Sequence, residues 1–316
     1  MVRFFVCLGL AASVAVRGAG LQEQPVFRGA GDVVPVFVTV TDGNGRLVTT
    51  LKREDFEVRD EGKPQPITVF DNTPRPIRLI VMLDVSGSMQ GNLPLLRAGA
   101  QQLVQRLRPD DGARIGTFGN DVVISPSFTR DANELLSALP STIAEDAPTP
   151  LWRAIDRAMA AFSAADRDAR HVVLVLSDGK DSGVMTNFRE RFVSQAEVID
   201  RGRRQDVMIY AVGMRSRGRP SAVGIGPGGL QAALMADQPD PGLAKVAEET
   251  GGGYTEIRFG EDLGAAFAQV ADELHSQYLL GFLPARRDGK VHDIEVKVAQ
   301  RGMKTRARTK YTAPKE

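Results

Sequence analysis

The sequence is nearly without cysteine, since Cys7 is the only one in 316 residues. No disulfide can form within the chain, so the fold must rest on its hydrophobic core. An excess of one charge is also lacking: 40 basic and 39 acidic side chains leave a formal charge of +1. The basic tail KTRARTK (304–310) reads as an edge strand protected by its charges. We therefore predict no nucleic-acid partner.

Several motifs of common catalytic and cofactor sites are missing as well. The chain has no G-x-x-x-x-G-K-[ST] loop, and no G-x-S-x-G nucleophile elbow, which disfavours an α/β-hydrolase. The three histidines, His171, His275 and His292, lack the spacing of metal ligands, so we expect no zinc site. GIGPGG (224–229) fits a dinucleotide fingerprint formally, but a proline lies inside it and no strand precedes it. We interpret residues 215–240 as a surface insertion.

Long apolar runs are lacking except at the amino terminus. Residues 1–20 combine Arg3, an apolar core from Phe4 to Val16 and then small residues, which is the pattern of a secretory signal peptide. The apolar core is too short to span a bilayer comfortably. We expect export, to the outside or to a periplasm, and no transmembrane segment after removal of the signal. An uncleaved anchor is the alternative interpretation.

Hydrophobic periodicity divides the remaining chain into three regions. Residues 27–75 are β-rich, as in the alternating run VVPVFVTVTD at 33–42. Residues 76–275 alternate apolar strands with helical patterns, which predicts a mostly parallel sheet with helices on both faces. Residues 276–316 return to a period of two. The predicted fold is α/β: a Rossmann-like, doubly wound domain plus a small β-sandwich formed by the two flanks.

Two of the apolar strands end in short acidic turns, LDVSGS and LSDGKDS. Because the carboxyl ends of parallel strands share one rim of the sheet, we expect Asp84 and Asp178 to lie at the same rim. Two unpaired acids in a crevice are unfavourable unless a positive charge lies between them. A hard divalent cation meets that demand, and Ser86 and Ser88 add hydroxyl oxygens. The alternative is that both serines merely cap the following helix.

D-x-S-x-S after an apolar strand resembles the metal-ion-dependent adhesion site (MIDAS) of the von Willebrand factor type A (VWA) domain. That family implies a threonine just before a helix with an L-[YW]-x-A pattern, and APTPLWRAI has Thr149 at that place. The family also implies a strand that ends in [ST]-D-G, which LSDG fits with Asp178. The resemblance covers about residues 76–275. The metal ligands that it implies are Asp84, Ser86, Ser88, Thr149 and Asp178.

Some residues depart from the family pattern. Pro148 and Pro150 stiffen the loop around Thr149, where family members often have glycines. Arg153 replaces a usual acid, and no acidic pair follows Ser88, so the second cation site of integrin-type domains is not expected. The two β-rich flanks are similar to those of a group of secreted bacterial proteins that carry this domain.

The resemblance implies a bound divalent cation, with Mg²⁺ as the first choice and Ca²⁺ or Mn²⁺ as alternatives. Neutral hydroxyl ligands leave the cation electrophilic, so an open coordination position favours an Asp or Glu carboxylate of a partner protein. We predict a secreted adhesion or protein-binding module that is not an enzyme, since a metal-activated water would need a general base. Neither Asp146 nor Asp181 has a geometric reason for that role. Two alternatives stay open: a hydrolase or phosphotransferase that uses Asp84 or Ser86, and a scaffold with a non-functional site.

Overall fold

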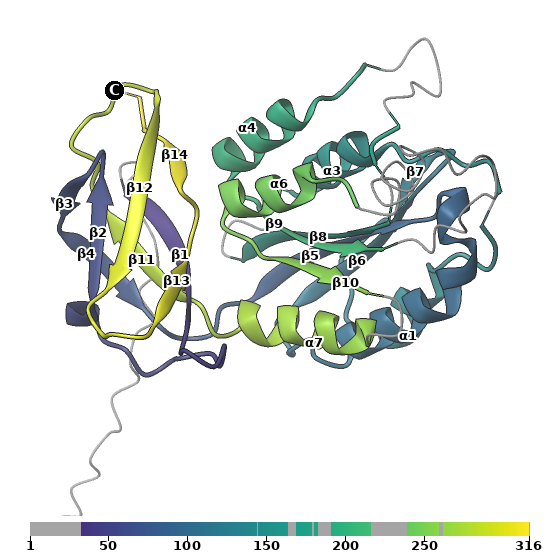
Figure 1. Cartoon of the computed structure of the whole chain (residues 1–316), viewed down its shortest axis with the longest axis horizontal. Coiled ribbons are helices and arrows are strands. Elements are labelled where there is room, and N and C mark those ends of the chain that lie inside the picture. Colours follow the sequence, from purple (N-terminus) through teal and green to yellow (C-terminus); the bar gives the residue numbers. More distant parts are fainter. Residues whose placement is uncertain are drawn as a thin grey trace, which may run out of the picture. The chain divides into compact units, whose positions relative to one another are not determined.

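A six-stranded sheet in the order β10-β9-β8-β5-β6-β7 forms the centre of the fold, and all neighbours are parallel except β7 against β6 (Figure 1). The strands are β5 (Ile77–Asp84), β6 (Gly112–Phe118), β7 (Val122–Ile124), β8 (Arg170–Ser177), β9 (Met208–Met214) and β10 (Tyr254–Ile257). The computed structural model describes residues 33–143, 145–163, 169–178, 180–182, 191–215, 239–258 and 262–315. The predicted mostly parallel, doubly wound sheet is confirmed.

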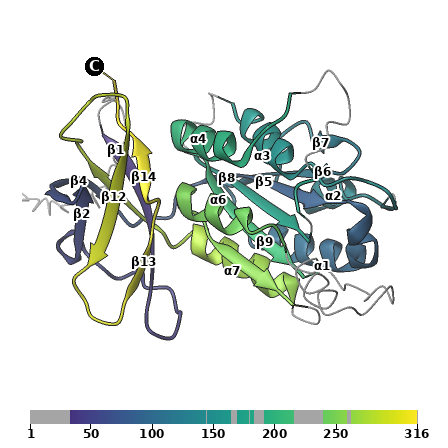
Figure 2. The same cartoon turned by 45° about the horizontal axis from the view of Figure 1, so that its top comes forward.

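Helices cover both faces of this sheet (Figures 1 and 2). Side chains alternate along β5: Leu79 and Val81 pack in one core with α1 and α7, whereas Ile80 and Met82 pack in another with α3, α4 and α6. Burial on both faces explains why this strand is a continuous apolar run. The helices are α1 (Leu93–Val104), α2 (Ala132–Ser137), α3 (Leu151–Ala160), α4 (Gln195–Gln205), α6 (Gly242–Thr250) and α7 (Leu263–Leu274).

The amino end of α4 lies later than the sequence pattern suggests. Helical spacing predicts a helix over 188–205. Residues 188–190 of this range lie outside the described part of the chain, residues 191–194 are not helical, and α4 starts at Gln195. Ser194 and Glu197 form a capping box, in which each side chain accepts a hydrogen bond from the other residue's backbone. A local hydrogen-bond pair therefore sets the start of this helix.

Two sequence predictions concern residues that lie outside the described part of the chain. These are the signal peptide at 1–20 and most of the surface insertion, at 216–238. Among the residues that are described, no helix is long and apolar enough to cross a membrane.

The two flanks build a pair of antiparallel four-stranded sheets with the orders β13-β1-β11-β4 and β14-β12-β2-β3. Each sheet combines strands from both flanks; β1 pairs with β11, and β2 pairs with β12. Side chains from both sheets share one core, which includes Val36, Val58, Tyr278 and Phe282. The strands are β1 (Val34–Thr41), β2 (Phe56–Asp60), β3 (Lys63–Gln65), β4 (Ile67–Asp71), β11 (Tyr278–Phe282), β12 (Val291–Val298), β13 (Lys304–Arg306) and β14 (Lys310–Thr312).

The basic tail differs from the single charged edge strand that the sequence suggests. It divides into β13, which pairs with β1, and β14, which pairs with β12, because the chain crosses from one sheet to the other. Arg306 forms an ion pair with Glu273, and Arg308 forms one with Asp206. These arginines therefore connect the flank to the α/β domain.

A buried polar network surrounds the end of α7. Oε1 of Glu273 accepts hydrogen bonds from the hydroxyls of Thr39, at 3.0 Å, and Tyr210, at 2.5 Å, in addition to its ion pair with Arg306. The guanidinium of Arg170 donates to Gln277 at 2.6 Å and stacks over the ring of Phe37. A buried carboxylate needs such partners, because without them its desolvation is uncompensated.

We predict that Arg306→Leu lowers the free energy of unfolding by about 2–3 kcal/mol, because it leaves the buried charge of Glu273 without its counter-ion. Urea denaturation of the full chain measures the change. Lys304→Leu, at an exposed position of the same strand, is the matched control and should change stability by less than about 0.5 kcal/mol. Equal effects of the two substitutions would contradict the role assigned to this ion pair.

Candidate metal centre

The two acidic turns meet at the carboxyl-terminal rim of the central sheet. Asp84 is the last residue of β5 and Ser177 the last of β8, and these strands are neighbours, with Leu83 paired to Leu176. Asp178 follows directly. Asp84 is 0% exposed and Asp178 is 2% exposed, so both carboxylates are buried where the sheet ends. The sheet register, rather than local sequence, brings them to the same rim.

Hydrogen bonds connect these carboxylates through the backbone N–H of Ser86 and the hydroxyls of Ser86 and Ser88. Oδ1 of Asp84 accepts from the backbone N–H of Ser86 at 2.8 Å, and Oδ2 accepts from the hydroxyl of Ser177 at 2.5 Å. The hydroxyls of Ser86 and Ser88 are 3.0 Å apart. Ser88 in turn donates to Oδ1 of Asp178 at 2.7 Å. Four of the five predicted ligands are therefore in one connected group.

The third loop, which carries Thr149, is tied to both turns by its backbone. The carbonyl of Ala147 accepts from the N–H of Gly87 at 3.2 Å, and the carbonyl of Thr149 accepts from the N–H of Ser182 at 2.9 Å. Thr149 is 8% exposed, and its hydroxyl makes no hydrogen bond with any described residue. That oxygen is thus available to a ligand, and backbone hydrogen bonds join its loop to the two turns that carry the other four residues.

Gly87 is required by this close approach of the loops. A Cβ atom at this position would lie 1.7 Å from the carbonyl oxygen of Glu145, which no side chain could tolerate without a shift of the backbone. The glycine between the two serines of D-x-S-x-S therefore lets the turn contact the loop that carries Thr149.

The structure does not support helix capping as the role of the serines. Ser86 occupies the N-cap position of the 3₁₀ helix Gly87–Asn92, but its side chain makes no capping hydrogen bond. Helix α1 begins later, after Asn92, which does not cap it with its side chain either. The hydroxyls of Ser86 and Ser88 instead lie 3.0 Å from each other, and Ser88 donates to Asp178.

The electrostatics of the rim oppose two free negative charges. Burial raises the pKa of Asp84 from an ordinary 3.8 to about 6; hydrogen bonds from Ser177 and Ser86 oppose this shift, and the charge of Asp178 adds to it. Each of these effects follows from the position of the carboxyl at the buried strand end. A cation between the carboxylates would favour the ionised form of Asp84 and remove the repulsion.

The donor set fits a hard divalent cation. Two carboxylates and three hydroxyls offer oxygen atoms alone, which suits Mg²⁺, Ca²⁺ or Mn²⁺ better than a metal that prefers nitrogen or sulfur. In the described segments, no cluster of three or more His, Cys, Asp or Glu side chains could hold a metal. The serine and threonine hydroxyls are therefore needed to complete this set of ligands.

Sequence reasoning did not identify Ser177 as part of the site. Its hydroxyl holds Oδ2 of Asp84, and the available signal was the serine in the strand-end pattern [ST]-D-G. Asp181, considered as a general base, accepts a hydrogen bond from the backbone N–H of Trp152 at 3.3 Å and so holds the start of α3. Asp146, the other residue considered, is exposed.

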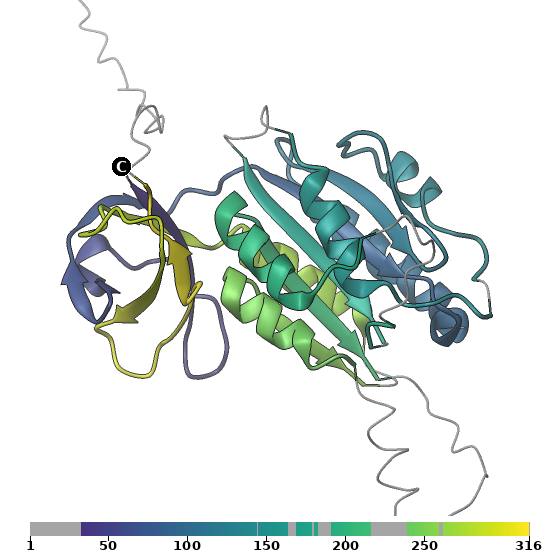
Figure 3. The same cartoon turned by 90° about the horizontal axis from the view of Figure 1, so that it is seen from above.

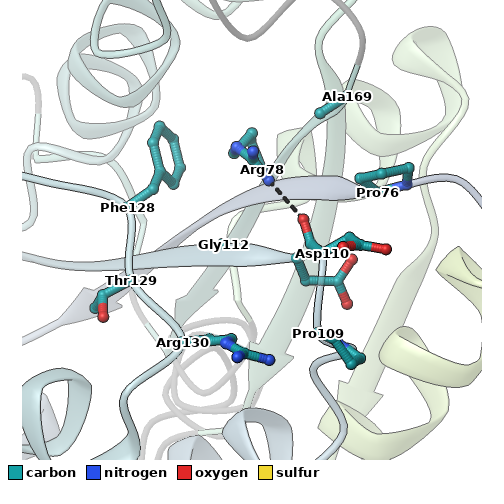
Figure 4. A pocket seen from close by; sticks show the side chains of 10 residues that line it. Pro76, Arg78, Pro109, Asp110, Gly112, Phe128, Thr129, Arg130 and Ala169 are labelled. Carbon is teal, nitrogen blue, oxygen red and sulfur yellow. Dashed lines mark hydrogen bonds between the residues drawn. The ribbon is translucent and has the colours of Figure 1, made fainter.

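A hollow of about 860 Å³ lies at the end of the sheet opposite the rim that carries Asp84 and Asp178 (Figure 4). Arg78, near the start of β5, pairs in register with Gly112 and donates to the backbone carbonyl of Asp110 at 2.9 Å. Phe128 and the exposed Arg130 also line this hollow. In parallel sheets of this kind, ligands bind at the carboxyl ends of the strands, so size alone does not make this hollow the functional site.

Comparisons with known proteins agree in part with this geometry. Residues 79–234 match the model of the von Willebrand factor type A domain. The comparison with curated proteins gave no match.

Three solved structures illustrate the similarity. A von Willebrand factor type A protein from Catenulispora acidiphila has 12% identity and a TM-score of 0.47, over 83% of this chain and 74% of that chain. The SpRpn10 VWA domain has 14% identity and a TM-score of 0.42, over 61% of this chain and 95% of that one. Proximal thread matrix protein 1 from the mussel byssus, with a zinc-occupied MIDAS motif, has 15% identity and a TM-score of 0.44, over 68% of this chain and 49% of that chain.

The range matched by the family model contains most of β5, all of β8 and all three loops of the rim. It also contains the five side chains that the sequence pattern singles out. Residues 79–234 are therefore a von Willebrand factor type A domain.

Proposed function

We propose that this protein binds a divalent cation, Mg²⁺ first, and through it a carboxylate of a partner protein. The ligands would be Asp84, Ser86, Ser88, Thr149 and Asp178. The observation that carries the proposal is that hydrogen bonds join Asp84 to Asp178 at the rim, through the backbone N–H of Ser86 and the hydroxyls of Ser86 and Ser88. Asp84 would supply charge, and the hydroxyls would supply neutral oxygens.

The exposure of the predicted ligands indicates the side from which a partner's carboxylate would reach the cation. Ser88 is exposed, whereas Asp84, Ser86 and Asp178 are buried. An external oxygen would therefore reach the cation beside Ser88. Because serine and threonine hydroxyls are neutral, two carboxylates would at most balance a divalent charge, and a third carboxylate from outside remains an attractive ligand. This favours an Asp or Glu side chain of a partner.

The same geometry favours recognition over catalysis. Both carboxylate oxygens of Asp84 already accept hydrogen bonds, and the side chain is fully buried, which makes it a poor nucleophile. Asp181 is engaged at the start of α3, so it is not poised to take a proton from a metal-bound water. Because all five predicted ligand side chains are present, a functional metal site is favoured over a scaffold with a non-functional site. Export remains part of the proposal, and it depends on the signal-like pattern of residues 1–20.

We predict that the full-length protein binds Mg²⁺ or Mn²⁺ and that Asp84→Ala weakens this binding by more than about 100-fold, because a charged ligand is lost. Ser177→Ala should weaken it by about 10-fold or more, since the hydroxyl only holds the ligand in place. Isothermal titration calorimetry measures both changes.

The matched control for this experiment is Asp146→Ala, which removes an exposed carboxylate three residues before Thr149. It should leave the metal affinity unchanged. If Asp84→Ala and the wild type bind the metal with equal affinity, and circular dichroism shows that both are folded, the rim is not the metal site.

A pH dependence follows from the raised pKa of Asp84, from 3.8 to about 6. Without metal, the native state holds this proton more tightly than the unfolded chain does. The free energy of unfolding should therefore fall as the pH rises from about 4 to about 6, by about 3 kcal/mol. Added Mg²⁺ should oppose this loss, because it binds the ionised form.

Urea denaturation in EDTA, with and without excess Mg²⁺, tests this over pH 4–8. Asp84→Asn keeps the shape of the side chain without a titrating group, so it should remove this part of the pH dependence. If the wild type and Asp84→Asn have identical pH profiles in EDTA, burial does not raise the pKa of Asp84, and the predicted pH dependence is wrong.

A further inference from the structure

Three helices of the α/β domain begin at the same rim as the candidate metal centre. Helices α3, α4 and α6 cover one face of the sheet (Figure 3) and lead to β8, β9 and β10, which are parallel strands. Their first turns meet at Gly242, the first residue of α6. A Cβ atom on this residue would lie 2.8 Å from Cζ2 of Trp152 on α3 and 2.7 Å from Nε2 of Gln195 on α4. The starts of the three helices are therefore packed against one another.

Two carboxylates lie at this junction, and each binds the start of a helix. Oδ1 of Asp240 accepts from the backbone N–H of Gly242 at 2.8 Å, and Oδ1 of Asp181 accepts from that of Trp152 at 3.3 Å. The second oxygen of Asp240 accepts from the backbone N–H of Asp181 at 3.1 Å. Backbone N–H groups in the first turn of a helix have no partner within the helix, so they favour a carboxylate. Asp240 thus joins α6 to the loop of Asp181, which in turn joins α3.

The same contacts reach the loop that carries Thr149. The carbonyl of Thr149 accepts from the backbone N–H of Ser182 at 2.9 Å, and Ser182 follows Asp181 directly. The residue after Thr149 is Pro150, which has no N–H with which to anchor the loop. Ser182 thus holds the chain before this proline, and Asp181 holds it after, at Trp152. The backbone is therefore fixed on both sides of the proline by two adjacent residues.

We propose that Asp181 and Asp240 are positioning residues of the metal site, which set the place of the Thr149 hydroxyl and do not touch the cation. Asp181 would act through the first turn of α3, and Asp240 through Asp181. The inference rests on the proposed function for the role of Thr149 as a ligand, whereas the contacts themselves do not require a metal. Outer contacts that orient a ligand typically change metal affinity by about 10–100-fold.

Asp181 and Asp240 are poorly suited to bind a second cation themselves. Both oxygens of Asp240 accept backbone hydrogen bonds. Asp181 also attracts a cationic side chain: burial and a neighbouring arginine lower the pKa of Arg153, and the charges of Asp121 and Asp181 oppose that shift. Arg153 follows Trp152 on α3. The charge and the hydrogen bond of Asp181 therefore act on the same turn of this helix.

The Mg²⁺ affinity of the full-length protein, measured by isothermal titration calorimetry, tests the proposal. Asp181→Ala should weaken Mg²⁺ binding by about tenfold. Asp181→Asn removes the same charge but keeps an oxygen that can accept from Trp152, so its affinity should stay within about twofold of the wild type. Equal losses in the two variants would mean that Asp181 acts by its charge alone, and would overturn the proposal. Asp240→Ala should cost less affinity than Asp181→Ala, because it acts one contact further away, and a larger loss would contradict that order.

A double-mutant cycle with Thr149→Val shows whether Asp181 acts through the Thr149 hydroxyl. Valine keeps the shape of threonine and removes the proposed ligand oxygen. Once that oxygen is gone its position no longer matters, so Asp181→Ala should weaken Mg²⁺ binding by less than about twofold in this background. If Asp181→Ala causes the same loss in both backgrounds, its effect is general and the positioning of Thr149 is excluded.

Asp262→Ala is the matched control, because Asp262 is also a carboxylate that caps a helix. It accepts from the backbone N–H of Gly264 at 2.8 Å at the start of α7, on the opposite face of the sheet. Its loss should reduce stability, as the loss of a cap does, and leave the Mg²⁺ affinity unchanged. If Asp262→Ala weakens Mg²⁺ binding as much as Asp181→Ala does, the loss of any cap is sufficient and the proposal is wrong.

Hydrogen exchange in EDTA separates this inference from the proposed function, because it needs no metal. Asp181→Ala should accelerate exchange of the Trp152 amide, which loses its acceptor, and Asp262→Ala should not. If exchange responds in this way but the wild type binds no Mg²⁺, the proposed function fails, and Asp181 remains a positioning residue of the Thr149 loop alone. If Mg²⁺ binding requires Asp84 but is unaffected by Asp181→Ala, the metal site stands and the positioning role is overturned.

Discussion

Two carboxylates buried at the ends of adjacent parallel strands are the constraint on which the rest of the rim depends. Asp84 and Asp178 are linked through Ser86 and Ser88 by hydrogen bonds, and their charges oppose each other in a buried setting. Hydrogen bonds from Ser177 and the backbone lower the free-energy cost of the charge on Asp84 only in part, since its pKa stays raised, at about 6. A divalent cation would balance the site, and it gives a physical reason for so many oxygen atoms in one place.

The architecture supports the rim from several directions. Register between β5 and β8 brings the two acidic turns together, and Gly87 admits the loop before α3. The flanking sandwich contacts the other end of the sheet, where Phe37 stacks under Arg170 at the start of β8 and Arg308 pairs with Asp206 just before β9. In the described part of the chain, these contacts keep the sandwich away from the rim. The exposed side chain of Ser88 therefore lies at the end of the sheet that the sandwich does not contact.

The sequence was sufficient for some of these features and not for others. The long apolar run of β5 and the D-x-S-x-S turn after it are local patterns, so both the strand and the polar strand end could be predicted. The hydrogen bond from Ser177 to Asp84 joins residues 93 positions apart and depends on strand register, which no local pattern contains. The same holds for the ion pair between Arg306 and Glu273. Because that arginine looked like a solvated charge, the division of the basic tail between two sheets was not predicted.

The most direct test of the central claim is a crystal structure of the full-length protein grown with excess Mn²⁺, with anomalous diffraction data to locate the metal. The account predicts an anomalous peak at the rim, about 2.0–2.6 Å from the hydroxyl oxygens of Ser86 and Ser88. Thr149 and the two aspartates should be bound directly or through water. An ordered rim without a peak, or a peak only at another place, would contradict the assignment of these five residues to one cation.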